Sequence, residues 1–123
     1  MHAIQTDEVY NLDLPFSLGI VHDDVVYLSG RTGRDPETGE IISDTREQAV
    51  QIFEDVETIL AEEGATMDDV VRTTVYVTDI DGNGVINDVY RTYLTEPYPA
   101  RSAVEVSDLA ADFDVEIEVL AVK

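Results

Sequence analysis

The chain has 123 residues, and 44% of them are hydrophobic, which suits a single domain with one ordinary core. Its 27 aspartates and glutamates outnumber 7 lysines and arginines, so the net charge is −20. Because this composition leaves no basic patch for phosphates, we expect no nucleic-acid partner. The absence of cysteine excludes disulfides, thiolate metal ligands and a cysteine nucleophile.

Neither the first residues nor the histidines indicate a membrane protein or a metalloprotein. Residues 1–8 lack the basic start and long apolar core of a signal peptide, and no apolar run approaches the ~20 residues of a membrane span. We therefore expect a cytoplasmic protein without a membrane partner. His2 and His22 lie far apart in the sequence, so no metal site is expected.

The first forty residues predict a short strand, a hairpin and a turn. The short strand would lie at residues 4–6. Two apolar runs, 15–22 and 25–29, flank an acidic dipeptide, an arrangement typical of a β-hairpin. Residues 35–39, Asp-Pro-Glu-Thr-Gly, have the composition of a turn.

A long amphipathic helix is predicted to begin at Asp44 or Thr45. Either residue can cap it, and Glu47 stands three residues after Asp44, where a capping box places a glutamate. Apolar residues recur at helical spacing along one face, at Ala49, Ile52, Phe53, Val56, Ile59 and Leu60. The opposite face is expected to expose the acidic residues Glu54, Asp55 and Glu62. Gly64 would end the helix.

The second half predicts three strands and a second helix. β-branched residues favour a strand at 70–78, and after a loop at 79–84 a helix is expected at 85–94. Further strands are expected at 102–106 and 115–122. The order strand, long helix, strand indicates a right-handed crossover that makes the strands before and after the helix parallel neighbours.

Together these elements predict an α+β domain with a mixed sheet of five or six strands and two helices. In the last strand one face holds Val115, Ile117, Val119 and Ala121. The other face holds Glu116, Glu118, Leu120 and Val122. If both helices cover the same sheet face, the other face has no cover within the chain, and an oligomer would bury it.

Arg101 stands at the mouth of a predicted strand, directly after a proline-rich loop at 97–100. The prolines stiffen the backbone, so the guanidinium could bind a carboxylate or phosphate bidentately. From the residue type alone, a surface arginine that offsets acidic charge is the simpler explanation.

Six short motifs follow one another along the chain. They are Ser29-Gly30, Asp35-Pro36-Glu37-Thr38-Gly39, Gln48, Asn87-Asp88-Val89-Tyr90, Pro99-Ala100-Arg101-Ser102 and Val115-Glu116-Ile117-Glu118. In this order they resemble the Rid (YjgF/YER057c/UK114) family. The match covers nearly the whole chain, and its last two motifs are the most specific.

The resemblance implies one domain over residues 1–123 with a chorismate-mutase-like fold. It also implies a homotrimer whose sheets line an inner barrel, with small carboxylate ligands in clefts between subunits. The implied reaction is hydrolysis of reactive imines and enamines, such as 2-iminobutanoate and 2-iminopropanoate, to 2-oxo acids and ammonia. Pyridoxal-phosphate-dependent dehydratases release these substrates from threonine and serine, and the hydrolysis itself needs no cofactor or metal.

The motifs also imply roles for individual residues. Arg101 would clamp the substrate carboxylate, and Glu116 would orient or activate the attacking water. Glu118, on the same strand face, is the competing candidate for the second role. The cleft would further be lined or shaped by Ser29, Gly30 and Asn87.

Four positions depart from the usual motifs of the family, and one of them is Ala110, which follows Leu109 where the family has Leu-Pro. Phe16 stands where a tyrosine is frequent and removes one hydroxyl from the pocket, and Ala103 replaces a common cysteine. Arg31 replaces a glutamine; it would either add a second guanidinium to the cleft or, as we favour, form a surface ion pair. These changes keep the carboxylate clamp and leave the identity of the substrate open.

Two other functions stay open. A non-catalytic trimer could bind a small carboxylate metabolite in the same clefts, and Phe16 and Arg31 favour this alternative somewhat. An endoribonuclease or translation inhibitor is opposed by the net charge of −20, which would repel phosphates.

The acidity itself suggests adaptation to salt. Acidic residues are spread along the chain and Lys123 is the only lysine, a composition that resembles proteins of salt-accumulating halophiles, especially halophilic archaea. At about 1 M salt the Debye length falls to ~3 Å, which would screen the self-repulsion of such a chain.

Overall fold

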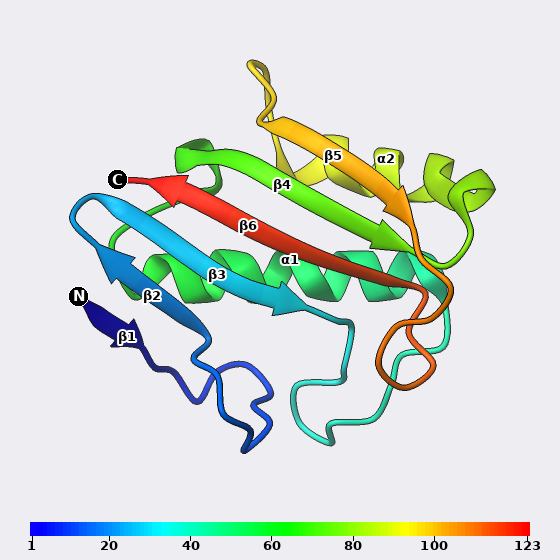
Figure 1. Ribbon diagram of the computed structural model, residues 1–123, viewed down its shortest axis with the longest axis horizontal. Coiled ribbons are helices and arrows are strands. Elements are labelled where there is room, and N and C mark those ends of the chain that lie inside the picture. Colours follow the sequence, from blue (N-terminus) through cyan, green and yellow to red (C-terminus); the bar gives the residue numbers. More distant parts are fainter.

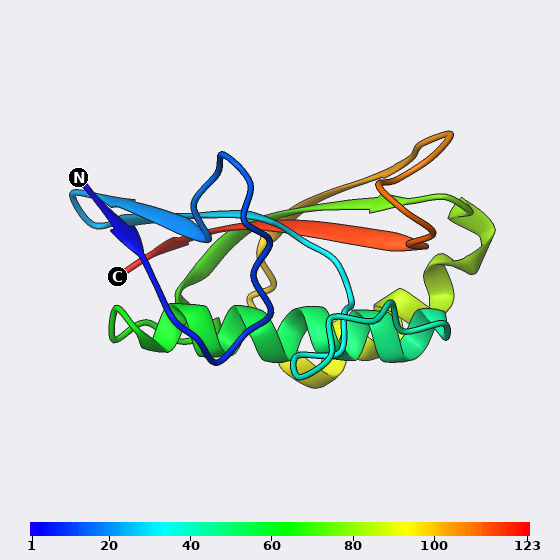
Figure 2. The same ribbon diagram turned by 90° about the horizontal axis from the view of Figure 1, so that it is seen from below.

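Six strands form one mixed sheet, and both α-helices cover the same face of it in the computed structural model, which describes residues 1–123 (Figures 1 and 2). The strands are β1 (His2–Ile4), β2 (Gly19–His22), β3 (Val25–Arg31), β4 (Val70–Val77), β5 (Ala100–Glu105) and β6 (Val115–Val122). The helices are α1 (Thr45–Ala61) and α2 (Asn83–Tyr93), with single 3-10 turns at Met67–Asp69 and Ile80–Gly82. The predicted α+β architecture is confirmed. Neither α-helix combines the length and apolar character of a membrane span.

Helix α1 begins and ends where the sequence predicts. Asp44 is the N-cap, and its side chain accepts a hydrogen bond from the backbone N–H of Glu47. Gly64, just beyond the end of the helix, has a φ of +69°, which a residue without a Cβ adopts freely. The predicted apolar stripe is fully buried against the sheet at Ala49, Ile52, Phe53, Val56, Ile59 and Leu60.

The strand order is β1-β2-β3-β6-β4-β5, which corrects one prediction. β4 does not lie beside β3, because β6 lies between them and is antiparallel to both. The parallel neighbour of β4 is β5, and α2 connects the two. β6 is the last element of the chain, so the order of the preceding elements could not reveal that it would occupy the middle of the sheet.

A β-bulge near the end of β3 breaks the alternation of that strand. The register with β6 is regular up to Leu28 and shifts before Arg31. Both residues are buried, although strict alternation would place them on opposite faces. The bulge therefore leaves Ser29 and Gly30 together toward the uncovered face and turns Arg31 toward the helices.

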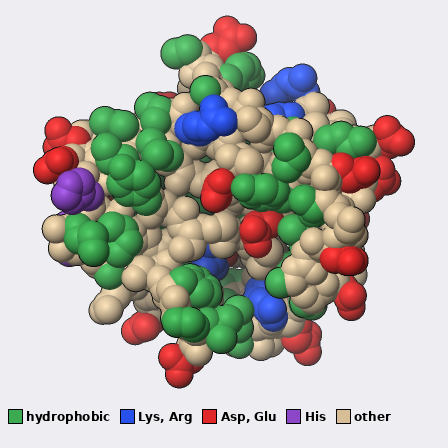
Figure 3. All heavy atoms as spheres, viewed as in Figure 1, with side chains coloured by type: hydrophobic (Ala, Val, Ile, Leu, Met, Phe, Trp, Pro, Cys, Tyr) green, Lys and Arg blue, Asp and Glu red, His purple; other side chains and the backbone are tan.

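The core lies between the sheet and the helices, and the opposite sheet face has no cover (Figure 2). β6 shows the predicted alternation, with the residues Val115, Ile117, Val119 and Ala121 buried. Figure 3 shows the uncovered face, where hydrophobic side chains gather in several groups with acidic side chains among them. The register places on this face the exposed apolar residues Tyr27, Val104 and Val122.

Candidate functional site

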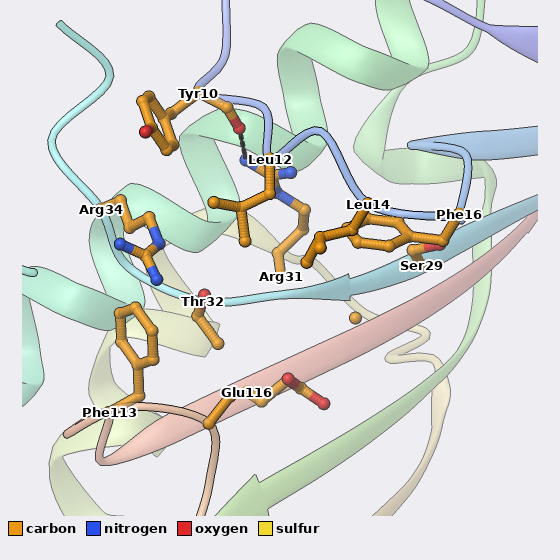
Figure 4. Close-up of a pocket in the computed structure, with 12 residues that line it drawn as sticks. Tyr10, Leu12, Leu14, Phe16, Ser29, Arg31, Thr32, Arg34, Phe113 and Glu116 are labelled. Atoms are coloured by element: carbon orange, nitrogen blue, oxygen red, sulfur yellow. Dashed lines mark hydrogen bonds between the residues drawn. The ribbon is translucent and has the colours of Figure 1, made fainter. Parts of the chain in front are cut away.

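A cavity of about 300 Å³ opens beside the end of β3, at the border of the uncovered sheet face (Figure 4). Three distant segments form its wall: the loop before β2, the end of β3 with the residues after it, and the residues around the start of β6. The cavity brings together five of the predicted site residues, Phe16, Ser29, Gly30, Arg31 and Glu116. The rest of the wall consists of Tyr10, Leu12, Leu14, Thr32, Arg34, Ala110 and Phe113.

Glu116 projects from β6 into this cavity and is half-buried. Its carboxylate packs over Gly30, where an added Cβ would lie only 2.9 Å from Oε2. A glycine at this place therefore makes room for the carboxylate. Burial raises the pKa of Glu116, and the nearby charge of Glu118 raises it further.

Glu118, the competing candidate, lies two residues further along the same face. It is exposed and does not line the cavity. Its Oε1 accepts a 3.1 Å hydrogen bond from the hydroxyl of Tyr76, and this bond, together with burial, raises the pKa of Tyr76. The geometry favours Glu116 as the carboxylate that meets a ligand, with Glu118 influencing its proton affinity.

Ser29 and Phe16 border the cavity with different chemistry. The Ser29 hydroxyl donates a 2.6 Å hydrogen bond to the carbonyl of Ser17, which ties β3 to the loop before β2. Phe16 is 50% exposed, and its ring forms an apolar wall at one end of the cavity (Figure 4). This wall offers no hydroxyl to a ligand.

Arg31 also borders the cavity, but its charge is matched inside the protein. Its Nη2 donates a 2.8 Å bond to Asp55 Oδ2 and a 3.1 Å bond to the carbonyl of Tyr10. The side chains of Arg31 and Asp55 are 10% and 4% exposed. An ion pair was expected, but its placement at the surface was wrong, as was the exposed position expected for Asp55. The bulge is the cause, because it turns Arg31 toward α1.

Arg101 lies in a second, separate hollow of about 200 Å³ beside α2. Its Nη2 donates a 2.6 Å hydrogen bond to Asn87 Oδ1, and its Cζ lies 4.9 Å from the centroid of the Tyr90 ring. Tyr90 is fixed in turn by a 2.9 Å hydrogen bond between its hydroxyl and that of Thr73. None of the ion pairs in the chain involves Arg101, so its charge is free for a ligand.

Within one chain, Arg101 and Glu116 face opposite sides of the sheet. Arg101 is paired with Thr73 of β4 on the helix-covered side, whereas Glu116 is paired with Tyr76 on the uncovered side. Ala103 shares the face of Arg101, packs against the core and borders neither hollow. The predicted site residues therefore form two groups, one around Glu116 and one with Arg101 and Asn87.

Several residues around both groups were not predicted from the sequence. Tyr10, Arg34 and Phe113 line the larger cavity, and Tyr98 lines the smaller hollow. The only signal for Tyr98 was its position in the proline-rich loop before Arg101. The other residues belong to loops without a periodic pattern, and only the fold shows that these loops meet.

The fold and the two hollows define a small α+β protein with a ligand-sized cavity at the border of its uncovered sheet face. The chain belongs to the Endoribonuclease L-PSP family, which matches residues 11–123. It is similar to the 2-iminobutanoate/2-iminopropanoate deaminase of Salmonella typhimurium, with 38% identity over 112 residues that cover 89% of this chain and 88% of the relative.

The fold of this chain is similar over its whole length to solved structures of related proteins. RidA from the Antarctic bacterium Psychrobacter sp. PAMC 21119 has a TM-score of 0.96 and 37% identity, with 100% of both chains covered. TdcF from Escherichia coli, solved with bound serine, has a TM-score of 0.93 and 33% identity, covering 100% of this chain and 99% of that one. The resemblance to the Rid family is thereby confirmed.

Proposed function

We propose that this protein hydrolyses reactive 2-imino acids and their enamine forms, such as 2-iminobutanoate and 2-iminopropanoate, to 2-oxo acids and ammonia. The observation that supports this most directly is a half-buried carboxylate with a raised pKa, Glu116, in a ligand-sized cavity. The 38% identity to the Salmonella deaminase supports the type of reaction. Serine bound to the Escherichia coli relative supports a small ligand with a carboxylate.

The arrangement of Arg101 and Glu116 suggests that the site lies between subunits. A complete site needs both groups around one ligand, and a single chain places them on opposite sheet faces. We infer that one chain contributes the Glu116 group and its neighbour contributes Arg101 and Asn87. A homotrimer with its sheets around an inner barrel, which the family resemblance implies, would also cover the exposed apolar residues of the open face.

In this site the chemistry needs one cation and one carboxylate. Arg101 holds the substrate carboxylate by a charge-assisted bond, and Asn87 fixes the guanidinium through its 2.6 Å hydrogen bond. Glu116 takes a proton from water as the water oxygen adds to the imine carbon, and it then protonates the departing nitrogen. One water is consumed, the C=N bond is replaced by C=O, and ammonia leaves. A raised pKa suits a carboxylate that both accepts and returns a proton.

The remaining predicted residues have supporting roles. Ser29 and Gly30 lie beside Glu116, and Phe16 forms an apolar wall of the cavity. Arg31 supports the bulge of β3 through Asp55, so its charge is not available to the ligand.

An RNA-cleaving activity, which the name of the Endoribonuclease L-PSP family denotes, has little support in this chain. Its net charge is −20, which would repel a phosphate backbone. Four of its 7 basic side chains already pair with carboxylates, namely Arg31, Arg46, Arg91 and Lys123.

The proposal is tested with 2-iminobutanoate generated by a threonine dehydratase, in moderate and in molar salt, and trapped with semicarbazide. The wild-type chain should divert imine from the trap. Arg101→Ala should lose at least about tenfold in rate with the charge-assisted bond, and Glu116→Ala about 100-fold with the proton-transfer group. Arg46→Gln is the control, since Arg46 is exposed and lies outside both hollows.

Each result has a distinct meaning for the proposal. If the wild-type chain does not accelerate hydrolysis but binds 2-oxobutanoate, the protein is a metabolite-binding protein rather than a deaminase. If Glu116→Ala keeps full activity while Arg101→Ala loses it, the role of Glu116 in proton transfer is wrong.

A further inference from the structure

Arg34 is a cation without a carboxylate in a chain where carboxylates are abundant. The sequence has 27 acidic residues against 7 basic ones. Most of the basic side chains are in ion pairs, including that of Arg31, three residues earlier. Arg34 forms none, so the protein itself does not balance this charge.

The Arg34 side chain is held between two aromatic rings at one end of the larger cavity (Figure 4). Its Cζ lies 4.9 Å from the centroid of the Phe113 ring and 5.9 Å from that of Tyr10. Its Nη1 donates a 2.9 Å hydrogen bond to the carbonyl of Gly39. A guanidinium fixed in this way loses little freedom when a ligand binds to it.

The hydrogen-bonding capacity of Arg34 is largely unused. The bond to Gly39 is the only one that its guanidinium forms, and its Nε is buried without any partner. A guanidinium has five N–H donors in a planar fork that matches the two oxygens of a carboxylate. An acceptor that entered the cavity at this end would meet unused donors on an unbalanced cation.

Arg34 and Glu116 border the same cavity, and no ion pair joins them. In Figure 4 they come from different walls, and Thr32 lies between them. Arg31 borders the cavity too, but Asp55 neutralises it. The cavity therefore offers a ligand one carboxylate for proton transfer and, at a distance from it, one available cation.

We propose that Arg34 binds a second carboxylate, so that the site accepts 2-imino dicarboxylic acids of four or five carbons, such as 2-iminosuccinate and 2-iminoglutarate. This inference rests on the proposed function. Arg101 of the neighbouring chain holds the carboxylate next to the imine carbon, and Arg34 holds the carboxylate at the far end. The hydrolysis is unchanged, since one water enters, ammonia leaves and both carboxylates persist.

The size of the cavity is compatible with such a ligand. A five-carbon diacid separates its two carboxylate carbons by about 5 Å, given C–C bonds of ~1.5 Å. The cavity of about 300 Å³ has room for a molecule of this length. A monocarboxylic imine with a short apolar chain would leave the Arg34 end unfilled.

Calorimetric binding of two stable product acids tests the proposal without catalysis. We expect the wild-type chain to bind 2-oxoglutarate more tightly than 2-oxobutanoate. In Arg34→Gln this preference should fall about 10- to 100-fold, the effect of losing a charge-assisted bond. Arg46→Gln removes an exposed arginine outside the cavity and should keep the wild-type preference.

A second variant separates binding from folding. Arg34→Met keeps an unbranched apolar stem between Tyr10 and Phe113 while removing the charge, and thermal unfolding shows whether each variant is folded. A folded Gln or Met variant with the wild-type preference overturns the proposal. A wild-type chain without any preference for 2-oxoglutarate overturns it as well.

Kinetics distinguishes this inference from the proposed function. The ratio of kcat/KM for 2-iminoglutarate to that for 2-iminobutanoate should fall in Arg34→Gln as the binding preference does. If the wild-type chain hydrolyses neither imine but shows the Arg34-dependent binding preference, deamination is wrong and the second carboxylate site stands. If the wild-type chain hydrolyses 2-iminobutanoate, and Arg34→Gln changes neither the binding preference nor the kcat/KM ratio, deamination stands and the second carboxylate site is wrong.

Discussion

Glu116 and Arg101 differ from the other charged residues of the chain in their surroundings. Most of the 27 acidic residues are solvated, whereas Glu116 is half-buried over Gly30 and has a raised pKa. Arg101 is held by an amide and an aromatic ring rather than by a carboxylate. A carboxylate that can exchange a proton and a cation that is free for an anion are the two groups that the proposed hydrolysis needs.

Replacing Glu118 by glutamine should lower the pKa of Glu116. Burial, the larger cause of the raised pKa, would remain, but the repulsion from the charge of Glu118 would disappear. When kcat/KM is plotted against pH, the limb that reports ionisation of Glu116 should therefore move to lower pH. Initial rates with 2-iminobutanoate across the acidic and neutral range measure this shift.

Glu37→Gln is the matched control for this shift. Glu37 is exposed in the turn after β3 and borders neither hollow. The control should leave the limb in place. A limb that stays in place or moves to higher pH in Glu118→Gln would show that the two carboxylates do not interact as described.

The sequence predicts the sheet face on which Glu116 lies, but not the one on which Arg31 lies. Strict alternation along β6 places Glu116 and Glu118 on the uncovered face, and they lie there. Arg31 could not be placed in this way, because the bulge that inverts the alternation of β3 arises from its pairing with β6, a strand more than eighty residues away.

At the scale of elements, the Arg31–Asp55 ion pair joins the bulged end of β3 to α1. Asp55→Leu should destabilise the protein by about 3–5 kcal/mol, because it leaves the buried guanidinium without a counter-charge. The double variant Arg31→Met/Asp55→Leu should recover most of this loss, since no buried charge remains. Urea unfolding at one fixed chain concentration measures both values.

The exposed pair of Arg46 and Asp88 is the control for this ion pair. Its side chains are 51% and 60% exposed, so Arg46→Gln should change the free energy of unfolding by less than about 1 kcal/mol. An equally small effect of Asp55→Leu, or a double variant no more stable than the single one, would contradict a structural role for the buried pair.

Local elements were predictable where local chemistry determines them. Asp44 caps the start of α1, Gly64 follows its end, and the apolar stripe sets its buried face, all as predicted. The position of β6 was not predictable, because its insertion between β3 and β4 depends on pairing across the whole chain. The same long-range pairing brings the loops of Tyr10 and Phe113 together at the cavity.

For the whole molecule, a net charge of −20 predicts that salt stabilises the fold. The temperature of half-unfolding should rise between about 0.1 and 1 M KCl, as the Debye length falls from about 10 to about 3 Å and repulsion between surface carboxylates is screened. Sucrose of equal osmolality, which does not screen charge, is the control. A temperature of half-unfolding that is unaffected by KCl, or that rises equally in sucrose, would contradict salt adaptation.

From the sequence, one sheet face would lack cover if both helices packed on the other, and the structure places both helices on one face. The sequence does not reveal that Arg101 and Glu116 lie on opposite sides of the sheet. Their faces follow from the registers of β4 with β5 and β6, which no local pattern determines. This separation is the reason to place the complete site between two chains.

Hybrid trimers test that placement most directly. Arg101→Ala and Glu116→Ala chains with different tags are co-expressed, and assemblies that contain both are purified. If each site takes Arg101 from one chain and Glu116 from its neighbour, every mixed trimer has one intact site, and the hybrids should show about one third of the wild-type activity with 2-iminobutanoate. Hybrids no more active than their two parent variants would show that the site does not combine these residues across chains.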